Sequence, residues 1–153
     1  MIEESTGLET IEKRIRKAGL KVTPQRINVL QILLAGSHPT AEYLIEKVRE
    51  KYSSISTSTV YHILDVFVEK GVIGKVYTHG DVMRYDAVLE NHHHLHDIES
   101  DRIEDYFDDE LFLLIKKYFK NKPVYGFELT DIKIKLLGKF NNEIFKNEYR
   151  SIF

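Results

Sequence analysis

The residues with the clearest capacity for chemistry form a histidine run in the middle of the chain, Asn91–His96, which holds four of the seven histidines. In an extended segment alternate side chains share one face, so His92, His94 and His96 are expected together while His93 points away. Two imidazoles at this spacing are able to grip one metal ion. The alternative is an exposed polar turn, whereas a purification tag would normally lie at a terminus.

Carboxylates near the run extend the possible ligand set. Asp86 and Asp105 would add oxygen atoms, and a mixed nitrogen and oxygen set suits iron, manganese, zinc or cobalt without selecting among them. The chain contains no cysteine, which excludes disulfides and thiolate metal sites. By spacing alone, the isolated His38 and His79 are assigned to turns or to the surface.

A second candidate site is the polar face of a helix expected from about Thr57 to Lys70. Small hydroxyls, a tyrosine and a histidine at its N-terminal end are able to contact phosphates and base edges in a DNA groove. The candidate DNA-binding residues of this face are Ser58, Thr59, Tyr61 and His62. Basic residues upstream would attract the DNA backbone. They are Lys13, Arg14, Arg16, Lys17, Lys21 and Arg26. The alternative is a solvated helix in an ordinary helical domain.

Helices that position these groups are predicted by apolar periodicity and by capping residues. The first covers about residues 9–18. Thr23 and Pro24 start a second helix that ends at Gly36, with Ile27, Leu30, Leu33 and Leu34 inward. A third begins at Thr40, and the fourth is the polar-faced helix. After Gly71 the period changes to two, which predicts a hairpin, residues 72–78 and 82–86, around a His79-Gly80-Asp81 turn. Residues 1–86 therefore read as a winged helix-turn-helix domain.

The second half, residues 87–153, reads as a small α/β dimerisation domain, so the fold class is α+β. A strand is expected at about residues 102–107, a helix at 110–118, and a long strand where Ile132, Ile134 and Leu136 alternate with lysines. A last helix is expected from residue 140, with Phe140, Ile144, Phe145 and Tyr149 inward. Two domains in 153 residues each need a partner to bury enough apolar surface, which favours a homodimer.

Charge and composition narrow the function classes. The net charge of -2 conceals an asymmetry: residues 1–85 hold 12 basic and 10 acidic residues, and residues 86–153 hold 10 and 14. The first half is thus the better nucleic-acid binder. No apolar run approaches the roughly 20 residues of a membrane helix, and no secretion signal is present, which indicates a cytoplasmic protein without membrane partners. A glycine-rich cofactor loop and a separate general base are lacking, so an enzyme, such as a non-haem metalloenzyme, is a remote alternative.

Four motifs in order resemble the ferric uptake regulator (Fur) family over about residues 10–138. They are Gly19-Leu-Lys-Val-Thr-Pro-Gln-Arg26, Ser37-His-Pro-Thr-Ala-Glu42, Ser58-Thr-Val-Tyr61, and Arg84-Tyr-Asp86 followed by His92-His-His94. The resemblance implies a dimeric winged-helix repressor that binds a palindromic double-stranded operator when loaded with a divalent metal ion.

The resemblance also implies roles for single residues. The family's regulatory metal site falls on His38, Asp86, His92, His94 and Asp105. Tyr61 matches a base-contacting tyrosine, and Lys21 matches a lysine that reaches toward the minor groove. The aspartate at the last ligand position, Asp105, resembles the peroxide-sensing (PerR-like) subgroup. The alternative is an alignment shifted by one residue, in which the neighbouring Glu104 is the last ligand. The implied cofactor is one Fe(II) or Mn(II) per subunit, with Zn(II) as an option, and hydrogen peroxide would oxidise His38 or His92.

Two departures from the family pattern lead to further expectations. Most relatives carry a structural zinc on two Cys-x-x-Cys pairs, and the matching positions here are near Asp97 and Ser100 and near Phe140 and Glu143, so that zinc is expected to be missing. Some members of the family have a second metal site, and this chain has no counterpart of the late histidine of that site. Apolar packing by the expected last helix would replace the zinc. An iron- or zinc-responsive repressor without peroxide chemistry, and a DNA-binding protein indifferent to metal, are the remaining alternatives.

Overall fold

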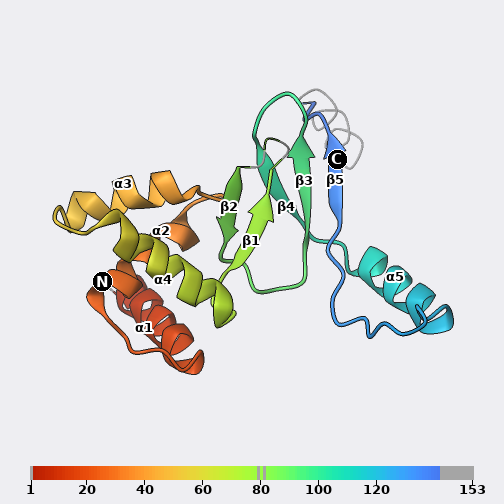
Figure 1. Cartoon of the computed structure of the whole chain (residues 1–153), viewed down its shortest axis with the longest axis horizontal. Helices are drawn as coiled ribbons and strands as arrows, with labels where there is room; N and C mark the ends of the chain where they lie inside the picture. Colours follow the sequence, from red (N-terminus) through yellow and green to blue (C-terminus); the bar gives the residue numbers. More distant parts are fainter. Residues whose placement is uncertain (1, 79, 81, 142–153) are drawn as a thin grey trace. The chain divides into compact units, whose positions relative to one another are not determined.

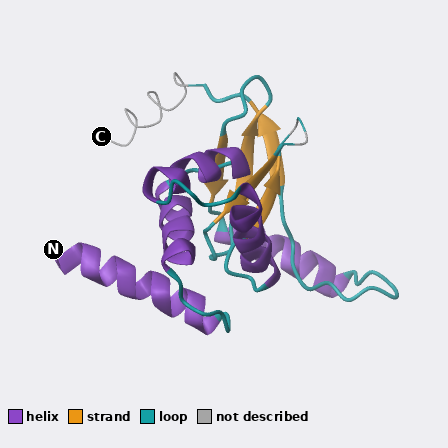
Figure 2. Cartoon of the chain, turned by 60° about the vertical axis from the view of Figure 1, so that its left-hand side comes forward, coloured by secondary structure: helices purple, strands orange, loops and turns teal. Residues whose placement is uncertain are grey.

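The computed structural model describes residues 2–78, 80 and 82–141. The chain divides into two compact units, Met1–Glu90 and Asn91–Phe153. Within the described residues, helices α1 to α4 and strands β1 and β2 belong to the first unit, and strands β3, β4 and β5 and helix α5 to the second (Figures 1 and 2). The α+β class expected from the sequence is confirmed. None of the helices in the described part of the chain is long and apolar enough to cross a membrane.

The helices of the first unit are α1 (Ile2–Lys17), α2 (Pro24–Ala35), α3 (Ala41–Lys51) and α4 (Thr57–Glu69). Capping side chains mark the starts of α2, α3 and α4. Thr23 accepts a hydrogen bond from Arg26 N at 3.3 Å, and Thr40 accepts one from Tyr43 N at 3.2 Å. Ser56 does the same for Thr59 N at 3.1 Å. Each cap satisfies an amide that has no partner inside its helix, which explains why these helices start where the sequence predicted.

The core of the first unit lies between these helices. Leu30, Leu44, Leu64 and Phe67 have no exposed surface. One predicted core residue is wrong: Leu34 is 47% exposed, and Val29 is fully buried in its place. Val29 shares a helix face with Leu33, four residues later, just as Leu30 shares it with Leu33, three residues later. The buried face of α2 is therefore rotated slightly from the predicted one, which buries Val29 and exposes Leu34. Helix α1 also begins earlier than the expected residue 9.

The hairpin of the first unit consists of β1 (Gly74–Tyr77) and β2 (Met83–Asp86), paired antiparallel. Residues 79 and 81 of the predicted turn lie outside the described residues. The hairpin is tied to the start of α3, since Thr40 forms a bridge with Arg84 and Tyr85 N donates to Pro39 O at 3.0 Å. Three packed helices followed by this hairpin form the predicted winged helix-turn-helix.

The sheet of the second unit has the strand order β4-β3-β5. Strand β3 (His93–Asp97) pairs antiparallel with β4 (Ile103–Tyr106) and parallel with β5 (Lys135–Gly138). The predicted long strand is shorter than the alternation of residues 132–136 suggested, although Ile134 O still accepts from His94 N at 3.1 Å. The predicted helix at 110–118 is present as α5 (Asp109–Asn121).

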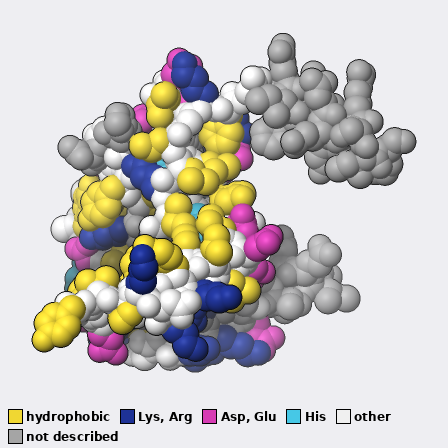
Figure 3. Space-filling model, turned by 90° about the vertical axis from the view of Figure 1, so that its right-hand side faces the viewer, with side chains coloured by type: hydrophobic (Ala, Val, Ile, Leu, Met, Phe, Trp, Pro, Cys, Tyr) yellow, Lys and Arg dark blue, Asp and Glu magenta, His cyan; other side chains and the backbone are white. Residues whose placement is uncertain are grey.

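Helix α5 presents apolar side chains that its own chain does not cover. Among its residues none is buried, and Leu113 and Leu114 are more than three-fifths exposed. Phe127, in the segment that follows, is exposed to the same degree. On the face of the molecule drawn in Figure 3, hydrophobic side chains are mixed with basic ones. Exposed apolar surface of this extent is typical of a face that meets another protein.

Candidate metal centre

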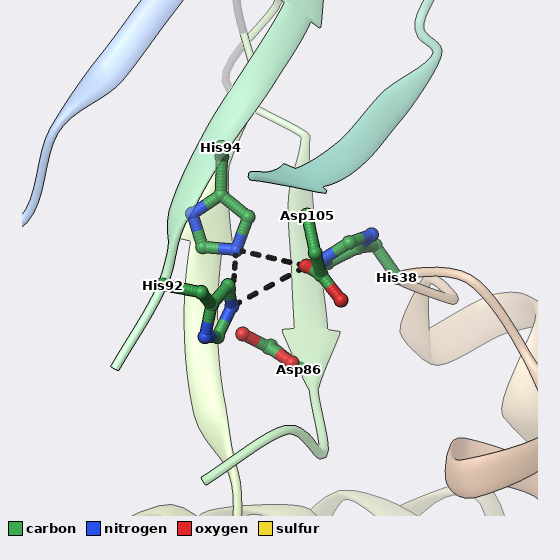
Figure 4. Close-up of side chains that lie close together, drawn as sticks. All are labelled: His38, Asp86, His92, His94 and Asp105. Atoms are coloured by element: carbon green, nitrogen blue, oxygen red, sulfur yellow. Dashed lines mark hydrogen bonds and ion pairs between the residues drawn. The ribbon is translucent and has the colours of Figure 1, made fainter. Parts of the chain in front are cut away.

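Three ligand-bearing side chains converge on the sheet of the second unit. The Nε2 atoms of His92 and His94 lie 3.1 Å apart, and Asp105 Oδ1 lies 3.3 Å from the first and 3.6 Å from the second (Figure 4). Strand pairing explains the convergence, because His94 is directly opposite Asp105 in the register of β3 and β4. Directly opposed residues of an antiparallel pair share a face of the sheet. We call these three residues the triad.

The triad has the geometry of ligands around one metal ion. Ligand atoms about 2.1 Å from an ion lie roughly 3.0 Å apart in octahedral and 3.4 Å apart in tetrahedral coordination. The triad separations fall around these values. The side chain of His92 is 2% exposed and that of His94 is 11% exposed, so water has little access to the nitrogens. Two imidazoles and one carboxylate therefore fit a divalent cation of the first transition row.

Glu104, the alternative to Asp105, points to the other face of the sheet. Its Oε1 accepts a hydrogen bond from Arg102 Nε at 2.8 Å, so its charge is already paired. Successive strand residues alternate between faces, so Asp105 and Glu104 are never on the same side. Within the second unit the structure brings Asp105 to the histidines.

Two further ligand-bearing side chains lie together in the first unit. A ring nitrogen of His38 and a carboxylate oxygen of Asp86 lie within 4.8 Å of each other. Arg84 Nη1 donates to His38 O at 3.0 Å, and with the bridge from Thr40 it fixes the loop of His38 beside the end of β2. His38 has a φ of 50°, a left-handed conformation that is strained for a residue other than glycine and is concentrated at functional sites. Both side chains are buried, which spacing alone did not indicate for His38.

The remaining histidines of the run take different positions. His93 points away from the triad, as predicted, and is buried. Burial lowers the pKa of its imidazole, against the opposing effect of the Asp108 carboxylate. His96 was predicted to share the face of His92 and His94, and its ring does contact that of His94, edge to face with centroids 6.2 Å apart. Among the described residues, His96 is not part of a group that brings ligand atoms together.

The candidate DNA-binding residues lie on and before α4. Ser58, Thr59 and His62 are exposed. The Ser56 hydroxyl lies 3.0 Å from that of Ser58 and 2.7 Å from that of Thr59, so the cap orders the polar end of the helix. Tyr61 is half-buried and donates from its hydroxyl to Glu42 Oε1 at 3.3 Å.

The basic residues predicted to attract DNA divide into two groups. Lys21 is exposed, and its carbonyl accepts from Arg26 Nη1 at 2.7 Å. Arg14, by contrast, is half-buried and donates to the carbonyls of Val72 and Ala87. Burial lowers the pKa of its guanidinium, while Asp86 acts in the opposite sense. The Arg14 side chain thus joins α1 to the residues just before β1 and just after β2, a role that its place in a basic stretch did not indicate.

Two residues that hold the polar helix were missed from the sequence. Glu42 accepts from Tyr61, and Arg49 Nη2 donates to Thr57 Oγ1 at 2.8 Å. Both lie on α3, and a basic or acidic residue on an exposed helix face has no local signature of such a role. The Ser37–Glu42 motif contained Glu42 without indicating its partner.

Hydrogen bonds gather at Asp97, which lies near one of the positions that match the cysteine pairs of the resembled family. The Asp97 carboxylate accepts from Glu99 N at 2.8 Å, Ser100 N at 3.2 Å and Phe140 N at 3.3 Å. The Glu99 amide is the main cause that lowers the pKa of Asp97. The Phe140 ring packs under Arg102, with 4.1 Å between the guanidinium carbon and the ring centroid. Of the residues expected to replace the zinc by apolar packing, Ile144, Phe145 and Tyr149 lie outside the described residues, as does Glu143.

The model of the ferric uptake regulator family matches residues 17–137. Among curated proteins, the peroxide-responsive repressor PerR of Staphylococcus epidermidis is 38% identical over 90 residues, which cover 58% of this chain and 59% of that protein. The chain thus spans less than two thirds of this relative. PerR of Staphylococcus saprophyticus is 30% identical over 115 residues, which cover 70% of this chain and 78% of that protein.

Solved structures extend the similarity over most of the chain. A peroxide stress regulator of Campylobacter jejuni has a TM-score of 0.68 and 26% identity, and covers 89% of this chain and 97% of that one. The Helicobacter pylori ferric uptake regulator, described with three functional metal-binding sites, has a TM-score of 0.71 and 27% identity, and covers 89% and 92%.

Proposed function

Because the chain belongs to the ferric uptake regulator family, we propose that it is a dimeric, metal-dependent transcriptional repressor that responds to peroxide. The convergence of His92, His94 and Asp105 carries the proposal, since a plain DNA-binding protein has no use for three buried or half-buried ligands on one sheet face. The winged helix supplies the second requirement, a DNA-reading element. Cytoplasmic location follows as part of the same proposal, because the target is the genome.

The proposed regulatory site combines the triad with the pair from the first unit. Its ligands, all drawn in Figure 4, are His38, Asp86, His92, His94 and Asp105. Three nitrogens and two carboxylates suit one Fe(II) or Mn(II) ion per subunit and also accept Zn(II). The absence of cysteine removes the thiolates that would favour zinc in a structural site.

Metal binding would control DNA binding by joining ligands from both units. An ion held by all five ligands restricts how the first unit moves against the second, and thereby the distance between the two reading heads of a dimer. Linkage requires that DNA tighten metal binding by the same factor as metal tightens DNA binding. A coupling of roughly 1–3 kcal/mol corresponds to a change of about 5–150-fold in operator affinity.

DNA recognition is assigned to α4 in the major groove. Ser58, Thr59, Tyr61 and His62 would face base edges and phosphates, and Lys21 and Arg26 would contact the backbone. The exposure of Ser58, Thr59 and His62 supports this assignment. The exposed apolar face of α5 supports a homodimer, because a symmetric pair would cover it on both copies.

The peroxide response rests on Asp105 and on the relatives. Similar curated proteins are named peroxide-responsive repressors. Hydrogen peroxide would be the oxidant and the source of the oxygen atom, and bound Fe(II) would supply the one-electron chemistry that activates it beside an imidazole. The surrounding fold would hold His38 and His92 next to the ion and keep bulk water out. The oxygen atom would then be added to one of these ligands and not to a distant side chain. Loss of a ligand would then release the operator.

One titration tests the proposal. Purified metal-free protein is mixed with a DNA duplex selected from a random pool, and binding is measured against Mn(II), Fe(II) and Zn(II). The Fe(II) form is then treated with hydrogen peroxide, and the peptides of His38 and His92 are examined by mass spectrometry. Binding that is unchanged by a chelator would end the metalloregulator proposal. Metal-dependent binding without oxygen addition would end only the peroxide response, and would favour an iron- or zinc-responsive repressor.

A further inference from the structure

Arg14 is a half-buried cation that contacts two backbone carbonyls far from it in the sequence. Its Nη2 atom donates to Val72 O and to Ala87 O, the second at 2.5 Å. Removing a guanidinium from water costs free energy, which hydrogen bonds to neutral carbonyls offset only in part. The packing of α1 does not require this cation, because Ile11 and Ile15 of the same helix are already buried in the core of the first unit. The explanation must therefore lie in what the two carbonyls are attached to.

The carbonyl of Ala87 belongs to the peptide group whose amide holds Asp86. Val88 N donates to Asp86 Oδ1 at 2.8 Å, so the carboxylate closes a turn around Ala87. The Ala87 carbonyl and the Val88 amide share one planar peptide group, which is trans, so they point in opposite directions. Arg14 thus holds one end of this peptide group, and the Asp86 carboxylate is bonded to the other.

The second contact of Arg14 gives its guanidinium a rigid support. Val72 is 2% exposed, and its amide donates to Phe67 O of α4 at 2.8 Å. Gly71, with a φ of 69°, supplies the left-handed residue that turns the chain back in this way. Val72 therefore belongs to the C-terminal cap of α4, and the guanidinium bonded to it is fixed to the end of that helix.

We infer that Arg14 is a positioning residue for the metal ligand Asp86: by holding the Ala87 carbonyl, it fixes the peptide group whose amide orients the Asp86 carboxylate. Groups that hydrogen-bond to metal ligands set the orientation of those ligands, and their loss weakens metal binding by about 10–100-fold. Here the support passes through a backbone peptide from a side chain of another helix. The inference rests on the proposed function, in which Asp86 is a ligand of the regulatory ion.

A double-mutant cycle on Mn(II) affinity, measured by isothermal titration of the full chain, tests the inference. Arg14→Gln removes the charged donor and is expected to weaken Mn(II) binding about tenfold. Loss of a cation near the site would by itself strengthen the binding, so the sign of the change separates positioning from charge. In the Asp86→Ala background the carboxylate is already absent, and Arg14→Gln is expected to change the affinity by less than about twofold.

A stability-matched control and a spectrum exclude a general loss of structure. Val29→Ala removes buried apolar surface from α2 and lowers stability, yet its Mn(II) affinity should stay within about twofold of the wild type. With Co(II) in place of Mn(II), the visible absorption spectrum responds to the ligands around the ion. Arg14→Gln should move this spectrum toward that of Asp86→Ala, and Val29→Ala should leave it unchanged. If Arg14→Gln does not fold, Arg14→Lys replaces it, with changes expected in the same directions because its shorter side chain lacks the guanidinium fork.

The outcomes separate the inference from the proposed function. Unchanged or tighter Mn(II) binding by Arg14→Gln overturns the inference, and so does an equal loss in the wild-type and Asp86→Ala backgrounds; both leave the proposed function standing if Asp86→Ala itself weakens binding. An Asp86→Ala protein with wild-type Mn(II) affinity overturns the inference together with the assignment of Asp86 as a ligand. A wild-type protein that binds Mn(II) but ignores DNA contradicts the proposed function alone, and the cycle still decides the role of Arg14.

Discussion

His94 and Asp105 face each other directly across β3 and β4, and their Nε2 and Oδ1 atoms lie 3.6 Å apart. The adjacent Glu104 is opposite Leu95 and pairs instead with Arg102. Antiparallel register alone therefore decides which of two neighbouring acids reaches the histidines.

Substituting the two acids separately tests this assignment. Asp105→Ala is expected to weaken Mn(II) binding by more than about tenfold, because even loss of an outer partner of a metal ligand has an effect of that size. Glu104→Ala removes an equal charge from the other face and should leave Mn(II) affinity nearly unchanged. Isothermal titration of both variants makes the comparison. Equal losses would mean that net charge, and not ligation, attracts the ion.

A second pair of variants compares histidines of the same run. His94→Ala is expected to abolish strong Mn(II) binding, because it removes one of the converging nitrogens. His96→Ala removes a buried imidazole from the same strand without removing a member of the triad. Its Mn(II) affinity should remain close to that of the wild type, even if its stability falls. A larger loss of affinity for His96→Ala than for His94→Ala would refute the ligand set.

Arg14 is predicted to act in stability and not in phosphate binding. Arg14→Gln leaves the carbonyls of Val72 and Ala87 without their charged donor, and should lower the free energy of unfolding by about 2 kcal/mol. Arg16, an exposed partner of Glu12 on the same helix, is the control. Arg16→Gln should change stability little, since exposed ion pairs contribute weakly. Urea denaturation measures both, and a stable Arg14→Gln protein would argue that the buried guanidinium is dispensable.

The start of α5 is predicted to lose stability in acid. Asp108 caps the helix, and the Leu111 amide, followed by the Tyr106 hydroxyl, lowers the pKa of its carboxyl. Since the folded pKa lies below the unfolded value of about 4, the stabilisation is complete above that value and disappears as the pH falls through the folded pKa. Asp108→Asn keeps the cap without the charge. Circular dichroism should show the wild type more stable at neutral pH and the difference shrinking in acid.

The second unit is predicted to stay folded when metal is removed. Asp97 joins the turn after β3 to Phe140 by hydrogen bonds, so we expect the unit to fold without a structural zinc. Excess chelator should remove the regulatory ion and leave the far-ultraviolet spectrum unchanged. In chelator, Asp97→Ala should lower the Tm by a few degrees, whereas Asp101→Ala, an exposed acid of the same turn, should not. Unfolding by chelator alone would reveal a structural metal.

The sequence determined the elements whose signals are local. Thr23 with Pro24, Thr40 and Gly71 marked helix ends correctly, because capping and left-handed stops depend on a few adjacent residues. The change of period after Gly71 located the hairpin, and motif order indicated the family. His92 and His94 were paired by alternation alone, since strand geometry fixes that spacing.

Tertiary structure decided what depends on residues far apart in the chain. Register chose Asp105 over Glu104, and the bridge between Thr40 and Arg84 made a buried residue of His38, which looked like a surface turn. Arg14 became an internal donor to the carbonyls of Val72 and Ala87, a role that its place in a basic stretch did not indicate. A sequence lists which groups are able to bind, but burial and pairing arise only when distant segments pack, and these decide which groups meet.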